Sequence, residues 1–563
     1  MNYDMLLLNI SRNASEKETA FQECLGQHLI ASYVNQFGYR AKVYSGDVIG
    51  CKNIIENEIL FHHVKIVGFY VGADTVHLVA NIIKWIKSHY SVVISVGGPE
   101  AYSLDRDFLM QTNCDYIVYG EGELPSLNLL RLVVDHIGER GTIKSIKYID
   151  EAGCYVENEM EDLIMELDKL PFPDKKNSLN KRFRSTEIIG ILTGRGCPYH
   201  CAFCFEGASS KIVRLRSIKN VVSEIEDVKH NNPNLQIVYV YDDTFTLDRV
   251  RVMEFCEYMK SSGLKWICEG HVSRIHADPE LVQTMVDSGL YAMQIGIESG
   301  SRKVLDIYQK NITPEEIIEV VRICKEAGLT TLEGNYIVGG ALESAETIQE
   351  SIAHAKKLIE VGRGMIDIST VFFAPYTNTP ISKNPSDYDM KIENYQNDHT
   401  IVTMSEAVVS TKYLTSDEIV SWKRKFDEEI RQAYFAEILR LSKDELIRRW
   451  NPKKKKLEMN HSWSTALNGY LHMKEFVKHL GNGEQEYSEI KYPVRTICNC
   501  RHQNMEIEFD GIMLKGEEKE YIMLADGKRN IKEISALMGE SVEHVKNVYG
   551  RLNDRCFVYF SEF

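Results

Sequence analysis

Apolar runs and helical patterns alternate along the first 145 residues. Short apolar runs predict strands, and these lie at Met5–Asn9, Lys42–Tyr44, Ile66–Tyr70, Val92–Gly97 and Tyr116–Tyr119. Helical patterns separate them around Gly26–Phe37 and over Val79–His89. Strands that alternate with helices predict a parallel, doubly wound sheet.

The middle of the chain, 184–385, repeats a strand–helix unit six times. Helical spacing is clearest over Ser217–Lys229 and Pro314–Ala327. The predicted strands are Glu187–Leu192, Gln236–Tyr241, Trp266–Glu269, Ala292–Ile297, Thr331–Ile337 and Asp367–Phe373. Six such units predict a partial (β/α)6 barrel, and in barrels of this kind the chemistry lies at the carboxyl ends of the strands.

The last third is predicted to hold a helical region over 386–490 and a small domain over 495–563. The small domain has the element order of a winged helix. Its strands are Met505–Phe509, Ile512–Lys515 and Cys556–Phe560, and its helices are Glu518–Leu524, Ile531–Met538 and Val542–Leu552. The chain is thus expected to be an α/β protein with domains 1–145, 184–385, 386–490 and 495–563, and a linker over 146–183.

Composition narrows the class of partner. The 563 residues are 44% hydrophobic and 26% charged, and the net charge is −15. This acidic balance argues against broad affinity for nucleic acid or an anionic membrane. The sequence has no run of 18 apolar residues and no basic segment at its start, so we expect a cytoplasmic protein without membrane contact.

Three of the thirteen cysteines form one compact motif. Cys197, Cys201 and Cys204 make a CxxxCxxC triplet, whereas most of the others are scattered singly, as reduced thiols are. Three thiolates can hold three irons of a [4Fe–4S] cube, which leaves one iron open to an outside ligand. Zinc is the alternative, but structural zinc usually takes four ligands. For the pair Cys498 and Cys500, plain thiols are favoured over half of a metal site.

The carboxyl ends of three predicted strands of the N-terminal sheet carry glycines and acidic residues. They are Gly68, Gly97, Gly98, Gly120, Glu121, Gly122 and Glu123. Ligands of open α/β sheets bind beyond the carboxyl ends of the strands. Glycines at these ends would let a large cofactor approach the backbone, although taken alone they are also consistent with ordinary turns.

The cysteine triplet and the motifs after it resemble the radical SAM family over some 200 residues. The resemblance implies that Cys197, Cys201 and Cys204 ligate the cluster and that S-adenosylmethionine (SAM) fills the open iron. The residues it implies for SAM contact are Phe203, Asp242, Asp243, Glu298 and Ser299, with Arg214 and Arg216 as further candidates. Any single carboxylate among them could instead be a helix cap.

The N-terminal glycine motifs resemble the Rossmann-like cobalamin-binding domain that precedes many radical SAM enzymes. The matching stretches are Val67–Tyr70, Ser95–Pro99 and Asp115–Glu123. The DxHxxG signature is absent, so a bound cobalamin would lack a histidine from the protein as its lower ligand. A domain of this shape that has lost its cofactor is the alternative.

These resemblances imply a radical mechanism. The reduced cluster cleaves SAM to methionine and a 5′-deoxyadenosyl radical, which removes a hydrogen atom from an unactivated carbon. Methylcobalamin would then supply a methyl group, and C-methylation of a ribosomal peptide or natural product is the favoured reaction. A flavodoxin or ferredoxin would deliver the electron. The first alternative is a radical cyclase, rearrangement catalyst or epimerase without methyl transfer.

Further alternatives depend on the C-terminal domain and on the cysteines of the N-terminal domain. The last domain resembles the small domains that capture leader peptides of ribosomally made, modified peptides, but a capping or lid role and DNA binding remain open. A cobalamin- or redox-sensing DNA-binding regulator is therefore a second alternative to the enzyme. A tRNA methylthiotransferase is disfavoured, because Cys24, Cys51, Cys114 and Cys154 share no cluster-binding pattern.

Overall fold

The computed structural model describes residues 3–10, 24–72, 75–180, 186–205, 210–393, 407–451, 456–479, 488–497, 501–503 and 506–561. The pair Cys498 and Cys500 lies outside these ranges. Contacts divide the chain into two compact units, and the first holds the N-terminal sheet and most of the domain predicted over 184–385. Within the described ranges, no helix is long and apolar enough to cross a membrane.

The N-terminal sheet has seven strands in the order β2-β1-β3-β4-β5-β6-β7. They are β1 (Met5–Ile10), β2 (Ala41–Gly46), β3 (Ile66–Tyr70), β4 (Val93–Gly97), β5 (Tyr116–Val118), β6 (Ile146–Ile149) and β7 (Tyr155–Glu157). The five predicted strands are parallel. β6 and β7 come from the predicted linker and pair antiparallel, so the sheet is mixed and extends past residue 145.

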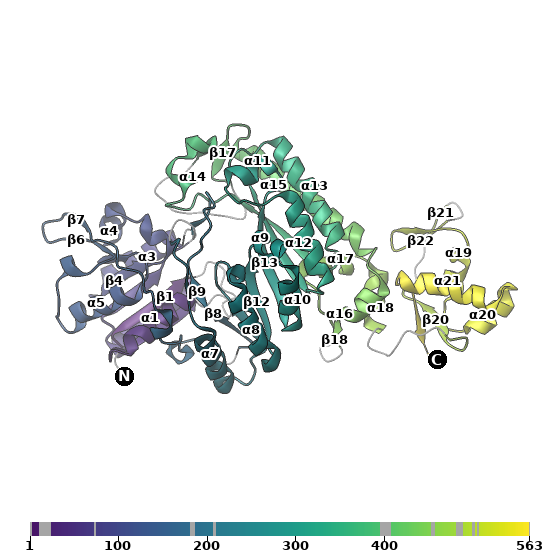
Figure 1. Ribbon diagram of the computed structural model, residues 1–563, viewed down its shortest axis with the longest axis horizontal. Coiled ribbons are helices and arrows are strands. Elements are labelled where there is room, and N and C mark those ends of the chain that lie inside the picture. The colour runs from purple at the N-terminus through teal and green to yellow at the C-terminus, as the bar shows by residue number, and fades with distance from the viewer. Residues whose placement is uncertain are drawn as a thin grey trace. The chain divides into compact units, whose positions relative to one another are not determined.

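Alternate strand residues supply two separate cores, one on each face of this sheet. Leu6 and Leu8 of β1 face one core, and Met5 and Leu7 face the other. The helices are α1 (Leu25–Asn35), α2 (Val48–His62), α3 (Val76–His89), α4 (Arg106–Thr112) and α5 (Glu123–Val134). α1 and α5 cover one face, and α2, α3 and α4 cover the other. In Figure 1, α3 and α4 lie on the opposite side of β4 from α1 and α5. Two-faced burial explains why these strands are apolar runs.

The second sheet has six strands in the order β15-β14-β13-β12-β11-β8, so consecutive strand–helix units are neighbours. The strands are β8 (Ile188–Ile191), β11 (Ile237–Val240), β12 (Lys265–Gly270), β13 (Leu290–Glu298), β14 (Thr331–Val338) and β15 (Ile366–Phe372). β8, β11, β12 and β13 pair in parallel. All six strands correspond to predicted ones.

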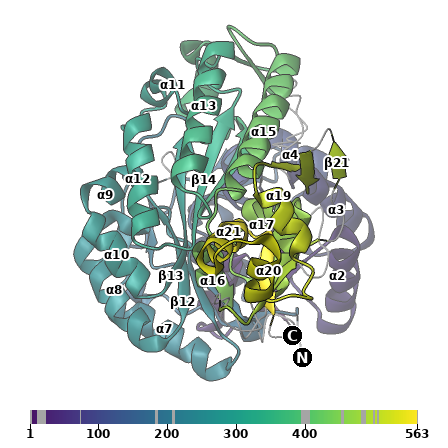
Figure 2. The same cartoon turned by 90° about the vertical axis from the view of Figure 1, so that its right-hand side faces the viewer.

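One or two helices follow each strand of this sheet along the chain. They are α7 (Ile218–Asn231), α8 (Arg249–Ser262), α9 (Val272–Ala277), α10 (Pro279–Asp287), α11 (Arg302–Ile307), α12 (Pro314–Glu326), α13 (Ala345–Val361) and α14 (Pro380–Lys383). Figure 2 shows α7, α8 and α10 along one side of β12 and β13. The carboxyl ends of the strands carry the candidate site.

The remaining elements include the predicted helical region and the C-terminal domain. The helices are α15 (Ser416–Ile438), α16 (Lys443–Arg449), α17 (His461–Asn468), α18 (Leu471–His479), α19 (Glu518–Leu524), α20 (Ile531–Met538) and α21 (Val542–Asp554). The strands are β16 (Met390–Ile392), β17 (Val409–Thr411), β18 (Trp450–Asn451), β19 (Lys456–Leu457), β20 (Tyr492–Arg495), β21 (Arg501–Gln503), β22 (Glu506–Phe509), β23 (Ile512–Leu514) and β24 (Val558–Ser561).

The C-terminal domain packs three helices against short antiparallel strands. β21, β22 and β23 form one sheet, and β20 pairs with β24. Phe509, Tyr521, Tyr549 and Phe557 are buried in the common core. A capping box between Asn530 and Glu533 starts α20, which begins and ends where the sequence predicts.

Candidate active site

Two short strands, each of two residues, pair to form a hairpin whose long connection carries Cys197, Cys201 and Cys204. This connection is called the cysteine loop. β9 (Gly194–Arg195) pairs antiparallel with β10 (Arg214–Leu215), so the two ends of the loop lie side by side. Gly196, the first residue of the loop, has a φ of +90°, and a side chain there would collide with the Ile212 carbonyl. The loop geometry therefore requires glycine directly before the first cysteine.

The three cysteines lie on this loop at the carboxyl end of β8. Cys197 and Cys201 are buried and Cys204 is half-buried. Cys197 Sγ lies 3.7 Å from Thr244 Oγ1, which belongs to the loop after β11. In the described part of the chain, no three His, Cys, Asp or Glu side chains converge on a position for a single metal ion. A cube differs because each thiolate binds its own iron, and three thiols on one loop fit that donor set.

A buried ion pair lies beside the cysteines. Lys310 Nζ is 2.8 Å from Glu298 Oε1, and both side chains are about one-tenth exposed. The Lys310 charge also acts on Cys201 and Cys204. Burial raises the pKa of the Cys201 thiol, and the ammonium of Lys310 partly opposes that rise. A positive charge next to thiols favours their deprotonated, metal-binding form.

Glu298 holds its position at the cost of an unusual backbone. Its φ is +62°, in the left-handed region that favours glycine. A side chain at Gly296 would collide with both the Glu298 carboxylate and Lys310. Phe203 packs edge-on against Tyr308, with ring centroids 4.9 Å apart, and Lys310 Nζ lies 6.0 Å from the Phe203 ring. Glu298 and Phe203 are thus brought together around Lys310.

Asp242 is fully engaged by the turn after β8. Its Oδ1 accepts hydrogen bonds from Thr193 N at 2.6 Å and Gly194 N at 3.0 Å, and its Oδ2 accepts one from the Thr193 hydroxyl. The residue is buried. Asp242 therefore anchors the backbone that leads into the cysteine loop.

Asp243, the next residue, faces a cavity instead. It lines that cavity beside Gly196, at the start of the cysteine loop. Burial and the neighbouring Asp242 raise the pKa of Asp243 to about 6, and a hydrogen bond from the Gly196 backbone opposes the rise. Of the two predicted carboxylates, Asp243 is the one available to a ligand.

Ser299 is buried within a turn. Its hydroxyl lies 3.1 Å from Ser351 Oγ of α13 and accepts a hydrogen bond from Ser301 N. Gly300 N donates to Ser351 at 2.9 Å. These contacts fix the chain after β13, and in doing so they hold Glu298 in place.

Two groups near the site have no counterpart among the predicted residues. His271, at the end of β12, stacks on Tyr199 of the cysteine loop with centroids 3.7 Å apart. Burial, Lys310 and Arg274 lower its pKa to about 3, so the ring is neutral. Glu343 is buried and accepts hydrogen bonds from Gly339 N and Gly340 N. The only feature of the sequence that could have indicated these two residues as part of the site is that each follows a predicted strand.

All seven glycine and acidic residues predicted for cobalamin line one cavity of about 590 Å³. The cavity also takes in Phe205 and Ser210 of the cysteine loop, together with Asp243. Its volume lies within the usual range of ligand sites. Gly98 has a φ of +123°, and a Cβ there would lie 2.6 Å from the Val71 carbonyl oxygen. The glycine loops and the cysteine loop thus share one hollow, which suits a large cofactor.

The two glutamates of the cavity wall are bound by arginines of the hairpin. Arg195 Nη1 lies 3.0 Å from Glu121 Oε1, and Arg195 Nη2 lies 2.5 Å from Glu123 Oε1. Arg214 Nη1 lies 2.7 Å from Glu121 Oε1. Burial acts to raise the pKa of Glu121, but Arg195, the Ile164 amide and Arg214 outweigh it, so the pKa is lowered. These ion pairs join the N-terminal sheet to the cysteine loop.

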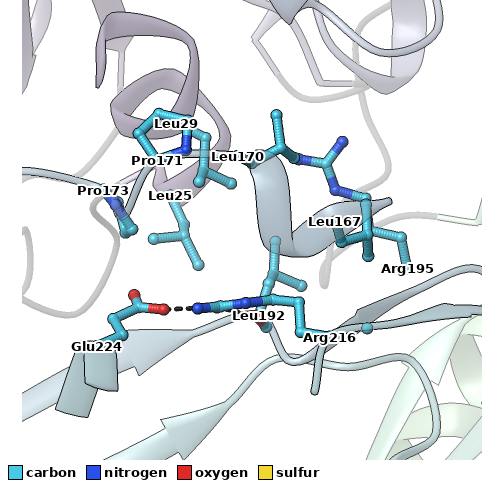
Figure 3. Close-up of a pocket in the computed structure, with 11 residues that line it drawn as sticks. Leu25, Leu29, Leu167, Leu170, Pro171, Pro173, Leu192, Arg195, Arg216 and Glu224 are labelled. Atoms are coloured by element: carbon cyan, nitrogen blue, oxygen red, sulfur yellow. Dashed lines mark hydrogen bonds and ion pairs between the residues drawn. The ribbon is translucent and has the colours of Figure 1, made fainter. Parts of the chain in front are cut away.

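A second, much smaller pocket lies near the same hairpin. Leu25 and Leu29 of α1 face the ion pair of Arg216 and Glu224, whose nitrogen and oxygen are 2.5 Å apart (Figure 3). The pocket volume of about 20 Å³ has room for a single water. It is a packing gap rather than a ligand site, and Arg216, a candidate for SAM contact, pairs here with a carboxylate.

Comparison with known proteins agrees with this geometry. Residues 191–355 match the family model of the radical SAM superfamily. An uncharacterized methyltransferase of Pyrococcus horikoshii is 28% identical over 376 residues, which are 65% of this chain and 76% of that protein. The anaerobic magnesium-protoporphyrin IX monomethyl ester cyclase of Cereibacter sphaeroides is 29% identical over 50% of this chain and 46% of its own length.

A solved structure shares the fold of the N-terminal sheet and of the six-stranded sheet that follows it. It is that of the cobalamin-dependent radical enzyme OxsB with aqua-cobalamin and SAM bound, and its TM-score is 0.61 at 16% identity. The match covers 97% of this chain and 78% of that one. The fold comparison therefore supports a mixed Rossmann-like sheet followed by a radical SAM sheet.

Proposed function

Because residues 191–355 carry a radical SAM domain, we propose that this chain is a cobalamin-dependent radical SAM enzyme that methylates an unactivated carbon. One observation supports it most. The cavity of about 590 Å³ is lined both by glycines within β3 and β4 and after β4 and β5, and by the start of the cysteine loop. A cofactor in that cavity would lie against the loop that holds the cluster.

The residues of the chain bind and orient the reactants. Cys197, Cys201 and Cys204 hold the cluster, and Asp243 attracts the ammonium group of SAM. When bound, the reduced cluster supplies the electron that cleaves SAM, and methylcobalamin supplies the methyl group. Three aromatic side chains of the cavity wall exclude water from the cavity, and they are Tyr70, Tyr102 and Phe205. A flavodoxin or ferredoxin provides the electron.

Anaerobic reconstitution with iron, sulfide and hydroxocobalamin tests the proposal. We expect bound cobalamin after desalting and, with dithionite and SAM, formation of 5′-deoxyadenosine. Replacing Cys197, Cys201 and Cys204 by alanine should abolish the cluster and the nucleoside while cobalamin is retained. Gly97→Val, which puts methyl groups into the cavity, should lose cobalamin but keep iron. Gly141→Val is the matched control, because Gly141 lies outside the cavity.

The outcomes separate the two halves of the proposal. Wild-type protein that takes up no cobalamin would rule out methyl transfer and leave radical chemistry standing. Protein that assembles no cluster, or that forms no 5′-deoxyadenosine, would rule out the radical enzyme altogether.

Cyclisation is the second candidate reaction, since a relative 29% identical over half of this chain is a cyclase. The products separate the two reactions. Methylation forms S-adenosylhomocysteine alongside 5′-deoxyadenosine, because a second SAM restores the methyl donor. A cyclase forms 5′-deoxyadenosine without S-adenosylhomocysteine.

We also propose that the C-terminal domain binds a peptide substrate. In the described sheet, β23 is an edge strand beside β22, and an extended peptide can add to such an edge. Fluorescence anisotropy measures whether the protein binds labelled synthetic peptides whose sequences are taken from small reading frames next to this gene. Saturable micromolar binding is expected, and no binding by any of them would reject the peptide proposal.

A further inference from the structure

The carboxylates of Glu121 and Glu123 are occupied by the hairpin that carries the cysteine loop. Arg195 lies two residues before Cys197, and Arg214 is its partner across the hairpin. The guanidinium of Arg195 spans both glutamates, at 3.0 Å from Glu121 and 2.5 Å from Glu123. Such a two-pronged contact needs the planar fork of arginine.

These ion pairs are shielded from water. The exposed fractions of the side chains are 4% for Glu123, 3% for Arg214, 16% for Arg195 and 17% for Glu121. Loss of one partner would leave a buried, unpaired charge, which is strongly unfavourable. The contacts therefore constrain where the hairpin lies.

The two glutamates of these ion pairs are themselves held in place by the N-terminal domain. Glu123 is the first residue of α5, and Glu121 lies in the turn before it. Glu121 Oε2 also accepts a hydrogen bond from Ile164 N at 3.0 Å. Arg214 Nη1 donates to the Ile164 carbonyl, also at 3.0 Å. One backbone residue thus braces both a glutamate and an arginine.

We propose that Glu121 and Glu123 are positioning residues for the cluster loop. Through Arg195 and Arg214 they let the N-terminal sheet set where the cysteines stand. The inference rests on the proposed function only in that the loop binds the cluster. It departs from the sequence-based expectation, which assigned both glutamates to cobalamin. The two glutamates and the two arginines also line the cavity. Binding of a ligand in the cavity is therefore expected to affect the position of the cluster loop.

The test is made on reconstituted full-length protein before any cobalamin is added. Glu123→Gln and Glu121→Gln should each weaken SAM binding at least fivefold and change the electron paramagnetic resonance spectrum of the reduced cluster with SAM. Glu151→Gln is the matched control, because its ion pair with Arg140, at 2.9 Å, is formed by a glutamate that is 92% exposed.

Arg195→Lys provides a variant that keeps the charge and the fold. A lysine cannot reach both glutamates at once, so the spectrum should change while iron content stays at the wild-type level. If the glutamine variants and Arg195→Lys match wild type in SAM affinity and spectrum, the proposal is wrong. Weaker hydroxocobalamin binding in those variants would then identify the glutamates as ligand contacts. Wild-type protein without any cluster signal would instead contradict the proposed function.

Discussion

At the scale of single residues, chemically identical side chains have opposite roles according to their partners. Asp242 and Asp243 are neighbours, yet Asp242 binds Thr193 and Gly194 while Asp243 faces the cavity. The adjacent residues Ser299 and Glu298, which differ in chemistry, also have separate roles, since Ser299 holds a turn and Glu298 pairs with Lys310. The motif alone could not distinguish the residues that support the site from those that face it.

Asp243 should make SAM binding depend on pH. Its pKa is raised to about 6, so the carboxyl group is neutral below that pH and charged above it. A charged carboxylate attracts the ammonium of SAM, and affinity should therefore rise as pH increases from 5.5 to 7.5. In Asp243→Asn the affinity at pH 7.5 should fall about tenfold, the effect of roughly 1.4 kcal/mol, and its pH dependence should disappear. Equilibrium dialysis with reconstituted protein measures both, and an unchanged pH profile in the variant would contradict this role.

At the scale of elements, the strands were predictable and much of their surroundings was not. Buried parallel strands are apolar on both faces, so runs such as Ile66–Tyr70 stand out in the sequence. Helix α2 was missed because its apolar residues do not gather on one side, and the short strands β6 and β7 lay within the predicted linker.

The partners of the candidate site residues were beyond the reach of sequence patterns. The chain order of the motifs correctly predicts that they meet at the ends of strands. However, Asp242 binds a residue 49 positions away, Ser299 one 52 positions away, and Glu123 one 72 positions away. Such pairings depend on the packed backbone, which no local pattern specifies.

Removal of the Asp242 carboxylate should loosen the turn after β8. Asp242→Ala leaves two backbone amides and one hydroxyl buried without their acceptor, and each unsatisfied group costs about 1–3 kcal/mol. We expect a lower urea midpoint and less than half of the wild-type iron after reconstitution. Asp242→Asn keeps one acceptor and should lie in between. Full iron loading of the alanine variant would show that the turn does not depend on this residue.

At the scale of the whole molecule, buried polar contacts join neighbouring modules. Within the second compact unit, Asp510 between β22 and β23 accepts a hydrogen bond from His472 N of α18 at 2.9 Å. The same carboxylate oxygen lies 2.7 Å from His472 Nδ1. The His472 ring also packs on Phe557, with centroids 4.6 Å apart. The helical region and the C-terminal domain are therefore one structural body at this point.

Loss of Asp510 should separate these two modules. Burial lowers the pKa of His472 despite the opposing effect of Asp510. Asp510→Ala removes two contacts from a buried histidine, and we expect a loss of about 1–3 kcal/mol. Hydrogen exchange should rise in α18 and in β22–β23 but not in α7, which lies in the other unit. Equal exchange in α18 before and after the substitution would contradict the coupling.

The ion pairs of Arg195 also bear on how the protein is made. Glu123 is synthesised 72 residues before Arg195, which takes about 4–14 s at ordinary translation rates. All seven strands of the N-terminal sheet, through β7, are synthesised before the hairpin and the cysteines, and domains generally fold in order from the N-terminus during synthesis. The docking place of the cysteine loop is therefore made first, and iron delivery during biogenesis is expected to act on a loop whose anchor is already folded.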